Sequence, residues 1–206
     1  MKTTLLFLTG LIYLTGIGLN FPGREQKKDQ PKNPLVIMKT AFGVITIELY
    51  PDKAPVTVAN FEKYIHENRF AGATFYRTVT PDNQPNNKIK IEVIQGGLFD
   101  DHHPAMLAPI PIETTQKTGL HHLNGSISMA RDTPNSATSE FFICIGDQPE
   151  LDYGGKRNPD GQGFAVFGRV IHGMNVVKKI QSQPAIGQMP KPKIPIKSVV
   201  LKDPQK

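Results

Sequence analysis

Short apolar runs that alternate with polar residues and stop at Gly or Pro recur along this chain of 206 residues. In LVIMKTAFGVITIELY, for example, Ile45, Ile47 and Leu49 alternate with polar residues. A period of two is typical of a strand with one buried face, and the turn at Phe42–Gly43 predicts a hairpin. Eighteen Gly and eighteen Pro residues fit a chain with many turns and argue against a helical bundle.

The same pattern predicts further strands, whereas two segments have helical spacing. Strands are expected at 36–40, 44–49, 73–79, 89–97, 125–132, 140–147, 164–173 and 194–203. Helices are expected over 56–70, just after Pro55, and over 174–182. Because the strands follow one another at hairpin distances without regular β-α-β alternation, the fold is predicted to be mainly β. A closed antiparallel sheet with helices capping its ends fits this order best.

The first 34 residues have a different composition. Lys2 precedes an apolar stretch without charge until Arg24, the arrangement of an export signal. We interpret 1–22 as a signal peptide or a retained N-terminal anchor, because about 17 apolar-to-neutral residues are near the lower limit for a bilayer span. Residues 23–34 are charged and are expected to form a flexible tether to a folded domain at 35–203. Export would place the protein in the periplasm or cell envelope.

Composition limits the kinds of partner and cofactor. The formal net charge is +6, and residues 1–34 hold half of it. Since no dense basic stripe with interleaved aromatic residues is present, nucleic-acid binding is not expected. The single cysteine, Cys144, lies in an apolar run and is expected to be buried. The pairs His102–His103 and His121–His122 match no zinc spacing, so no metal or other cofactor is expected.

Polar residues on strands and at strand ends are the candidates for function. In IEVIQGG the amide of Gln95 follows an alternating run, and the two glycines after it permit close approach of a backbone or ligand. In ATFYRTV, strict alternation places Arg77 on one side with Phe75 and Val79, an unusual place for an arginine. No nucleophile motif or acid–base pair accompanies them. One arginine and one amide beside apolar residues suit a peptide ligand better than bond breaking.

Six motifs occur together and in order: FYRTV, VIQGG, GSISMAR, NSATSEFFICIGD, LD and FAVFGRVIHGM. With this combination the chain resembles the cyclophilin-type peptidyl-prolyl cis–trans isomerases from about Leu35 to Lys202. The resemblance implies an eight-stranded antiparallel barrel capped by two α-helices, acting as a monomer without a cofactor. It also implies that proline-containing peptides and unfolded or folding proteins are the partners.

The resemblance further implies roles for individual residues. Arg77 would be the catalytic residue, donating a hydrogen bond to the proline nitrogen as the amide twists, and Gln95 would bind the substrate backbone. The implied substrate-binding residues are Tyr76, Val93, Gln95, Met129, Ala130, Arg131, Glu140, Phe142, Leu151 and Phe164. Phe142, Val93 and Leu151 would hold the proline ring.

Several positions depart from the best-known family pattern. Tyr76 stands where His is common, Glu140 where Gln is common, and Phe164 at the position of a pocket His. A pocket Phe corresponds to Glu92 and the rim Trp to Glu150. We therefore expect retained isomerase activity, a shifted peptide preference and weak binding of the cyclic-peptide inhibitor of the family.

Two hypotheses stay open at the level of sequence. Glu140 would lie within reach of Arg77, where it would either orient the guanidinium or compete with the substrate for it. The altered rim and the polar loop at 81–88 also suit a proline-peptide-binding chaperone or scaffold whose isomerase activity is incidental.

Overall fold

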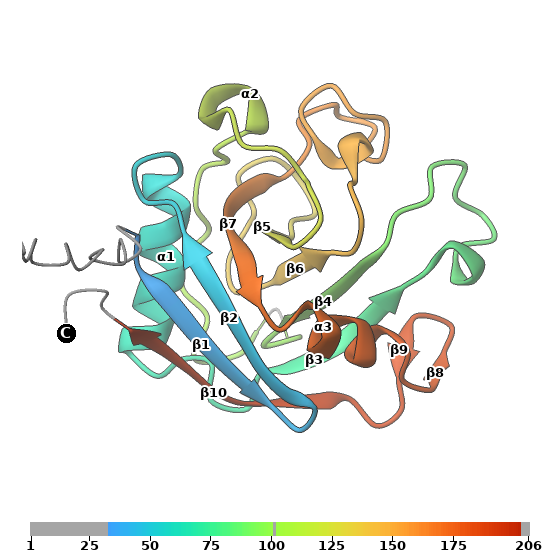
Figure 1. The fold of residues 1–206 in the computed structure, drawn as a ribbon. Helices are drawn as coiled ribbons and strands as arrows, with labels where there is room; N and C mark the ends of the chain where they lie inside the picture. Colours follow the sequence, from blue (N-terminus) through green and yellow to red (C-terminus); the bar gives the residue numbers. More distant parts are fainter. Residues whose placement is uncertain (1–32, 101, 203–206) are drawn as a thin grey trace, which may run out of the picture.

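A computed structural model describes residues 33–100 and 102–202 of the chain (Figure 1). Within this part, eight strands close into one antiparallel barrel. They are β1 (Leu35–Thr40), β2 (Gly43–Leu49), β3 (Thr74–Val79), β4 (Val93–Gly97), β5 (Ser126–Met129), β6 (Phe141–Cys144), β7 (Ala165–His172) and β10 (Ile194–Lys202). Around the barrel their order is β1-β10-β3-β4-β6-β5-β7-β2. The predicted eight-stranded closed barrel is confirmed.

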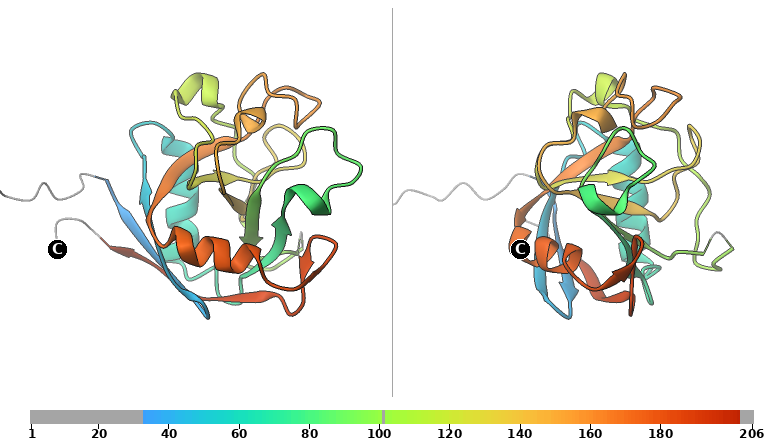
Figure 2. Two further views of the ribbon diagram at one scale, coloured as in Figure 1. Left: turned by 45° about the vertical axis from the view of Figure 1, so that its right-hand side comes forward. Right: turned by 90° about the vertical axis from the view of Figure 1, so that its right-hand side faces the viewer.

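The two predicted helices are present and bury apolar faces against the barrel. Helix α1 (Pro55–His66) packs against β7 and β10, and α3 (Met174–Gln181) packs against β2, β3 and β4. Figure 2 shows α1 alongside the barrel and α3 across its lower part. Pro55 occupies the first turn of α1, where its missing N–H costs no hydrogen bond.

Short elements that the periodicity did not predict complete the described part. A single helical turn, α2 (Thr115–Thr118), lies in the segment 102–118 that lacks periodicity. A two-stranded hairpin of β8 (Ala185–Ile186) and β9 (Met189–Pro190) lies in the Pro-rich segment after α3. The 3₁₀ turns η1 (Pro81–Asn83) and η2 (Pro149–Leu151) follow β3 and β6.

Aromatic side chains fill the barrel. The Phe61 ring of α1 lies 5.6 Å from the Phe141 ring and 5.1 Å from the Phe167 ring, and all three side chains are fully buried. Phe75 adds another fully buried ring, 5.9 Å from Phe141. Edge-to-face and tilted contacts of this kind stabilise a core beyond the burial of area alone. Since side chains occupy the interior, a ligand has to bind on the outside of the barrel.

The folded part begins slightly before the predicted boundary. Asn33 donates a hydrogen bond from Nδ2 to Glu48 Oε1 (3.2 Å), and the carbonyl of Pro34 accepts one from the Leu49 N–H (3.0 Å). These contacts attach the last residues of the expected tether to β2. The expected signal or anchor at 1–22 and residue 203 lie outside the described residues.

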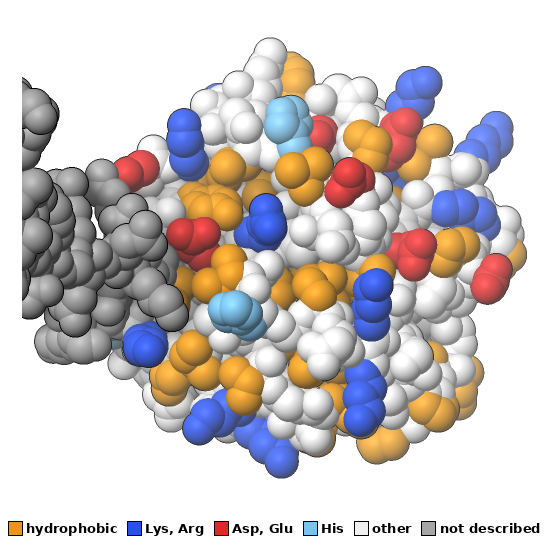
Figure 3. All heavy atoms as spheres, viewed as in Figure 1, with side chains coloured by type: hydrophobic (Ala, Val, Ile, Leu, Met, Phe, Trp, Pro, Cys, Tyr) orange, Lys and Arg blue, Asp and Glu red, His pale blue; other side chains and the backbone are white. Residues whose placement is uncertain are grey.

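Acidic and basic side chains are interspersed on the face in Figure 3, and no continuous basic stripe covers it. Within 33–100 and 102–202, no helix is both long and apolar enough to cross a bilayer.

Candidate functional site

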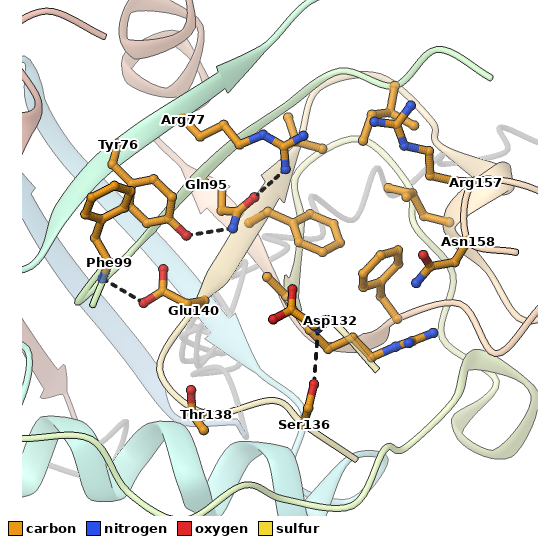
Figure 4. A pocket seen from close by; sticks show the side chains of 17 residues that line it. Tyr76, Arg77, Gln95, Phe99, Asp132, Ser136, Thr138, Glu140, Arg157 and Asn158 are labelled. Carbon is orange, nitrogen blue, oxygen red and sulfur yellow. Dashed lines mark hydrogen bonds between the residues drawn. The ribbon is translucent and has the colours of Figure 1, made fainter. Parts of the chain in front are cut away.

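A groove with a volume of about 420 Å³ opens on the outside of the barrel, beside β3, β4 and β6 (Figure 4). Ten of the eleven residues predicted for the site line it. They are Tyr76, Arg77, Val93, Gln95, Ala130, Arg131, Glu140, Phe142, Leu151 and Phe164. The structure therefore brings together strands and loops that are up to 88 positions apart in the chain.

Met129 is the exception, and its predicted contact with substrate needs correction. Its side chain is 1% exposed and packs in the barrel core. Met129 pairs with Phe141 across β5 and β6. Since directly opposed residues of an antiparallel pair point to the same face, Met129 shares the inward direction of the fully buried Phe141.

A β-bulge in β3 directs the side chains of two neighbouring residues into the groove. Strict alternation predicts Phe75 and Arg77 on one face, and this prediction is wrong. Phe75 pairs with Gly96 and Arg77 pairs with Gln95, so the register shifts at Tyr76. Because a bulge interrupts the alternation of side chains, Phe75 enters the core while Tyr76 and Arg77 both line the groove.

A chain of hydrogen bonds holds Arg77 and Gln95. The Arg77 Nη1 donates to Gln95 Oε1 (2.9 Å), and Gln95 Nε2 donates to the Tyr76 hydroxyl (2.6 Å). From the turn between β8 and β9, Gln188 Oε1 accepts a bond from Arg77 Nε (2.8 Å). Burial lowers the pKa of Arg77, which still remains protonated because an arginine does not lose its proton in proteins. The guanidinium is thus positively charged, partly desolvated and fixed by two neutral amides.

The second glycine after Gln95 makes room for a side chain of the protein itself. Gly97 has φ +147, and a Cβ there would lie 2.5 Å from Glu140 Oε1, closer than real atoms approach. This Oε1 accepts bonds from the Phe99 N–H (3.0 Å) and the Ser139 hydroxyl (2.9 Å). Gly97 therefore admits the carboxylate of Glu140.

Glu140 does not bind Arg77, contrary to both hypotheses about that pair. Among the described residues neither a hydrogen bond nor an ion pair joins them. Glu140 lies beside Tyr76 instead: burial chiefly, and then the Glu140 charge, raise the pKa of the Tyr76 hydroxyl. The hydroxyl therefore stays protonated at any physiological pH.

Apolar side chains form one part of the groove lining. The rings of Phe142 and Phe164 meet edge to face with centroids 5.4 Å apart, and Val93 and Leu151 complete the surface. Glu92, which was aligned with a pocket Phe, does not line the groove, whereas its neighbour Ile91 does. Glu92 Oε2 accepts a hydrogen bond from Gln181 Nε2. A compact apolar surface of this size suits a proline ring.

A buried histidine supports Phe142 from behind and accounts for one of the His pairs. The rings of His122 and Phe142 stack with centroids 5.8 Å apart. His122 Nδ1 lies 2.6 Å from Asp152 Oδ1 and its Nε2 lies 3.0 Å from Ser128 Oγ, while His121 contacts the other oxygen of Asp152. Burial lowers the pKa of His122 despite the Asp152 carboxylate, so the ring is neutral near pH 7. No cluster of three potential metal ligands occurs within the described part of the chain.

Arg131 contributes its backbone to the groove and its side chain to a loop. The guanidinium binds Asp160 through Nη1 (2.7 Å) and Nη2 (2.9 Å) and the Gly163 carbonyl through Nε (2.9 Å). It also lies 5.2 Å from the centroid of Phe164. Within the described ranges no hydrogen bond involves the Ala130 carbonyl or the Arg131 N–H. These two groups are available to the backbone of an extended peptide.

Sequence reasoning missed several residues that loops bring to the groove. The apolar ones are Ile91 and Phe99, and the polar ones are Asp132, Ser136, Thr138, Arg157 and Asn158. Glu150, which was aligned with the rim Trp, does not line the groove. Asp132 directly follows a motif of the site, but Arg157 and Asn158 lie in a Gly-rich loop with no periodicity to indicate their direction. Gln188 gave no signal, because its contact with Arg77 spans 111 positions.

Comparison with known proteins agrees with this geometry. Residues 35–201 match the family model described as cyclophilin type peptidyl-prolyl cis-trans isomerase/CLD. A peptidyl-prolyl cis-trans isomerase of Acinetobacter baylyi is 40% identical over 153 residues, which are 74% of this chain and 74% of that protein. Peptidyl-prolyl cis-trans isomerase B of Escherichia coli is 34% identical over 148 residues, covering 71% and 84%.

Solved structures share the fold at lower identity. A cyclophilin type isomerase of Cryptosporidium parvum superposes with a TM-score of 0.65 and 20% identity, covering 83% of this chain and 98% of that one. The same protein in the presence of the dipeptide Ala-Pro gives a TM-score of 0.64 at 21% identity, covering 82% and 99%. The match over residues 35–201 and the curated relatives lead to one conclusion: this chain belongs to the family of cyclophilin-type peptidyl-prolyl cis–trans isomerases.

Proposed function

We propose that this protein accelerates cis–trans rotation of X–Pro bonds in peptides and folding proteins, with Arg77 as the catalytic residue. Amide resonance sets a barrier of about 18–20 kcal/mol, and uncatalysed exchange takes on the order of tens to hundreds of seconds. No covalent intermediate is needed. An enzyme has only to bind the twisted amide more tightly than either planar form.

One observation carries this proposal: a fixed, uncompensated guanidinium stands beside the apolar surface of Phe142 and Phe164. Twisting the X–Pro bond ends the conjugation of the proline nitrogen and leaves a lone pair on it. Arg77 can donate a hydrogen bond to this lone pair, an interaction that the planar amide offers only weakly. Since Gln95 and Gln188 already hold the guanidinium, little reorganisation is needed during the rotation.

The remaining groups supply binding. The proline ring would rest on Phe142, Leu151 and Val93, and the free Ala130 carbonyl and Arg131 N–H would pair with the flanking peptide backbone. Binding of this kind stabilises the planar and twisted forms alike. It therefore lowers KM, whereas the contact with Arg77 raises kcat.

The experiment is exchange spectroscopy by NMR on a short Ala-Pro peptide, with the protein and its Arg77→Ala variant. The expected result is fast exchange that the variant loses almost completely. If a folded protein accelerates no peptide, the isomerase proposal is wrong. Retained binding without turnover would favour the alternative, a proline-peptide-binding chaperone or scaffold.

We further propose that the protein acts on exported proteins and functions as a monomer. The support for export is Lys2 followed by the apolar stretch up to Phe21. Cell fractionation with N-terminal sequencing tests export by a cleaved signal peptide and export with a retained anchor. Cleavage after the apolar stretch would indicate a signal peptide. An intact chain in the membrane fraction would indicate an anchor. Recovery of the intact chain in the cytosol would overturn it.

A further inference from the structure

We propose that the groove selects proline peptides that carry opposite charges on the two sides of the proline. This selectivity rests on the proposed function, because it describes the substrate of the same groove. Four charged groups carry the inference: Arg77 and Arg157 are basic, and Asp132 and Glu140 are acidic. Among the residues that the structure describes, none of these four takes part in an ion pair.

The charges are separated by sign across the groove. Figure 4 shows Arg77 and Arg157 along one side, with Asp132 and Glu140 toward the other. Apolar side chains, including Phe142 and Phe164, line the same groove. Low-dielectric walls between charges of opposite sign focus the electric field, so a peptide that crosses the groove meets a positive end and a negative end.

The positive end is built from a loop of this chain. Arg157 donates a hydrogen bond from Nη1 to the Ile89 carbonyl (2.6 Å), which ties the loop after β6 to the segment before β4. Arg157 and Arg77 lie along the same side of the groove, and neither forms an ion pair with a described residue. Burial, and then the charge of Arg77, lower the pKa of Arg157. Beside them Asn158 Nδ2 is a buried donor that makes no hydrogen bond. A carboxylate on the substrate would bind Arg157 and the Asn158 amide, and would leave Arg77 to the proline nitrogen.

The negative end has unused acceptors. Glu140 Oε2 is buried, with the Tyr76 hydroxyl beside the carboxylate and no ion-pair partner among the described residues. Asp132 is exposed, and no hydrogen bond joins its carboxylate to another described residue. One basic group stands near this end: Lys193 Nζ lies 3.2 Å from the centroid of the Phe99 ring at the rim. Lys193 is exposed and offsets only part of the negative charge. A lysine or arginine side chain of the substrate would complete the compensation.

The test compares three capped peptides of equal length with one central proline. The first carries only alanines, the second has Lys two residues before and Glu two residues after the proline, and the third has the two charges exchanged. We expect one charged peptide to exceed the neutral peptide in kcat/KM by about threefold per charge at low salt, and the other to fall below it. The difference should shrink toward unity at about 1 M salt, where the Debye length is only about 3 Å. The favoured order reports the direction in which the peptide crosses the groove.

Three variants locate the effect. Glu140→Gln keeps an oxygen for the Phe99 N–H and should remove the advantage of the basic side chain. Arg157→Gln should remove the advantage of the acidic one. Lys197→Gln, an exposed lysine of β10 that does not line the groove, is the matched control and should leave the ratios between peptides unchanged.

The outcomes separate this inference from the isomerase proposal. Acceleration of all three peptides at equal rates overturns the charge selection and leaves the isomerase intact. If no peptide is accelerated, the isomerase proposal fails. Charge selection is then tested by NMR titration, which compares the affinities of the three peptides for the groove. Equal affinities of the three peptides would overturn charge selection. Unequal affinities of the two charged peptides that become equal in both Glu140→Gln and Arg157→Gln would support it.

Discussion

Arg77 and Arg131 line the same groove, but their guanidinium groups bind different types of acceptor. Arg131 forms a bidentate ion pair with the Asp160 carboxylate and donates a hydrogen bond to the Gly163 carbonyl. Its side chain is only 1% exposed. Arg77 is held by the neutral amides of Gln95 and Gln188. The charge of Arg131 is neutralised inside the protein, whereas the charge of Arg77 is left for whatever enters the groove.

This difference shows how a fold separates structural from chemical use of one residue type. A bidentate carboxylate partner offsets most of the field of a guanidinium and fixes a loop. Amide oxygens fix the orientation of a guanidinium while leaving its net charge in place. The type of acceptor therefore indicates which arginine acts on substrate and which one stabilises the site.

The largest effect is expected from Arg77→Lys. Lysine keeps the charge but cannot reproduce the planar fork that reaches Gln95 and Gln188 together. We expect kcat/KM for a neutral Ala-Pro peptide to fall about 100-fold, equivalent to about 2.7 kcal/mol, and mainly through kcat. Thermal denaturation should show little change. A lysine variant with full activity would mean that charge alone, without fixed geometry, drives the rotation.

Arg131→Ala should affect stability more than chemistry. The variant leaves Asp160 unpaired, and because that carboxylate is 30% exposed we expect a loss of about 2 kcal/mol in the free energy of unfolding. Arg131 lowers the pKa of Asp160 below its unfolded value, so this contribution is present above the unfolded pKa and is lost as the pH falls through the folded pKa. Urea denaturation at pH 7 and near pH 3 tests this, and the difference in the free energy of unfolding between the variant and the parent should become smaller at the lower pH.

Arg169→Ala is the control for that experiment, because Arg169 is an exposed arginine of β7. Its removal should change the free energy of unfolding by less than about 0.5 kcal/mol. A loss as large as that of Arg131→Ala would show that the ion pair with Asp160 is not the cause.

Tyr76→Phe removes a single hydrogen bond from the chain that holds Arg77. Gln95 Nε2 loses its acceptor at 2.6 Å, and an amide whose donor is unsatisfied can turn its oxygen away from Arg77. We expect kcat/KM to fall about tenfold, equivalent to about 1.4 kcal/mol, with a shifted NMR signal of the Gln95 side-chain amide. Tyr153→Phe, at an exposed tyrosine, should change neither quantity.

The fold and most of the site were predictable from the sequence because their signals are local. Period-two strands, breaks at Gly and Pro and the resemblance in six motifs led to the closed barrel and to ten of the groove residues. The bulge at Tyr76 was not predictable, since a one-residue register shift leaves the alternation on either side unchanged. Met129 was assigned from its neighbours in a motif, although its pairing with Phe141 directs it into the core.

Long-range contacts limited the prediction further. Glu140 was expected at Arg77 because both lie near the groove, but its carboxylate is directed to the Phe99 N–H by the space at Gly97. Arg157 reaches the groove from a loop without periodicity, and its bond to Ile89 connects segments 68 positions apart. Interactions of this kind depend on how loops pack after the barrel closes, and no pattern of residue types records them.

Gln188→Glu gives the smallest expected effect and the most direct test of the comparison between the two arginines. The substitution preserves the acceptor for Arg77 Nε but replaces a neutral amide by a carboxylate, which makes the surroundings of Arg77 resemble those of Arg131. The half-buried ion pair is gained, but the hydrogen bond that Gln188 Nε2 donates to the Asn83 carbonyl (3.1 Å) is lost, so the free energy of unfolding should change by no more than about 1 kcal/mol. The same pair weakens the field at the proline nitrogen, so kcat/KM should fall about fivefold, and Gln188→Ala, which removes the acceptor but adds no charge, should cost only about twofold. If the glutamate variant is as active as the parent, the charge of Arg77 does not have to remain uncompensated, and the acceptor type no longer distinguishes the catalytic arginine from the structural one.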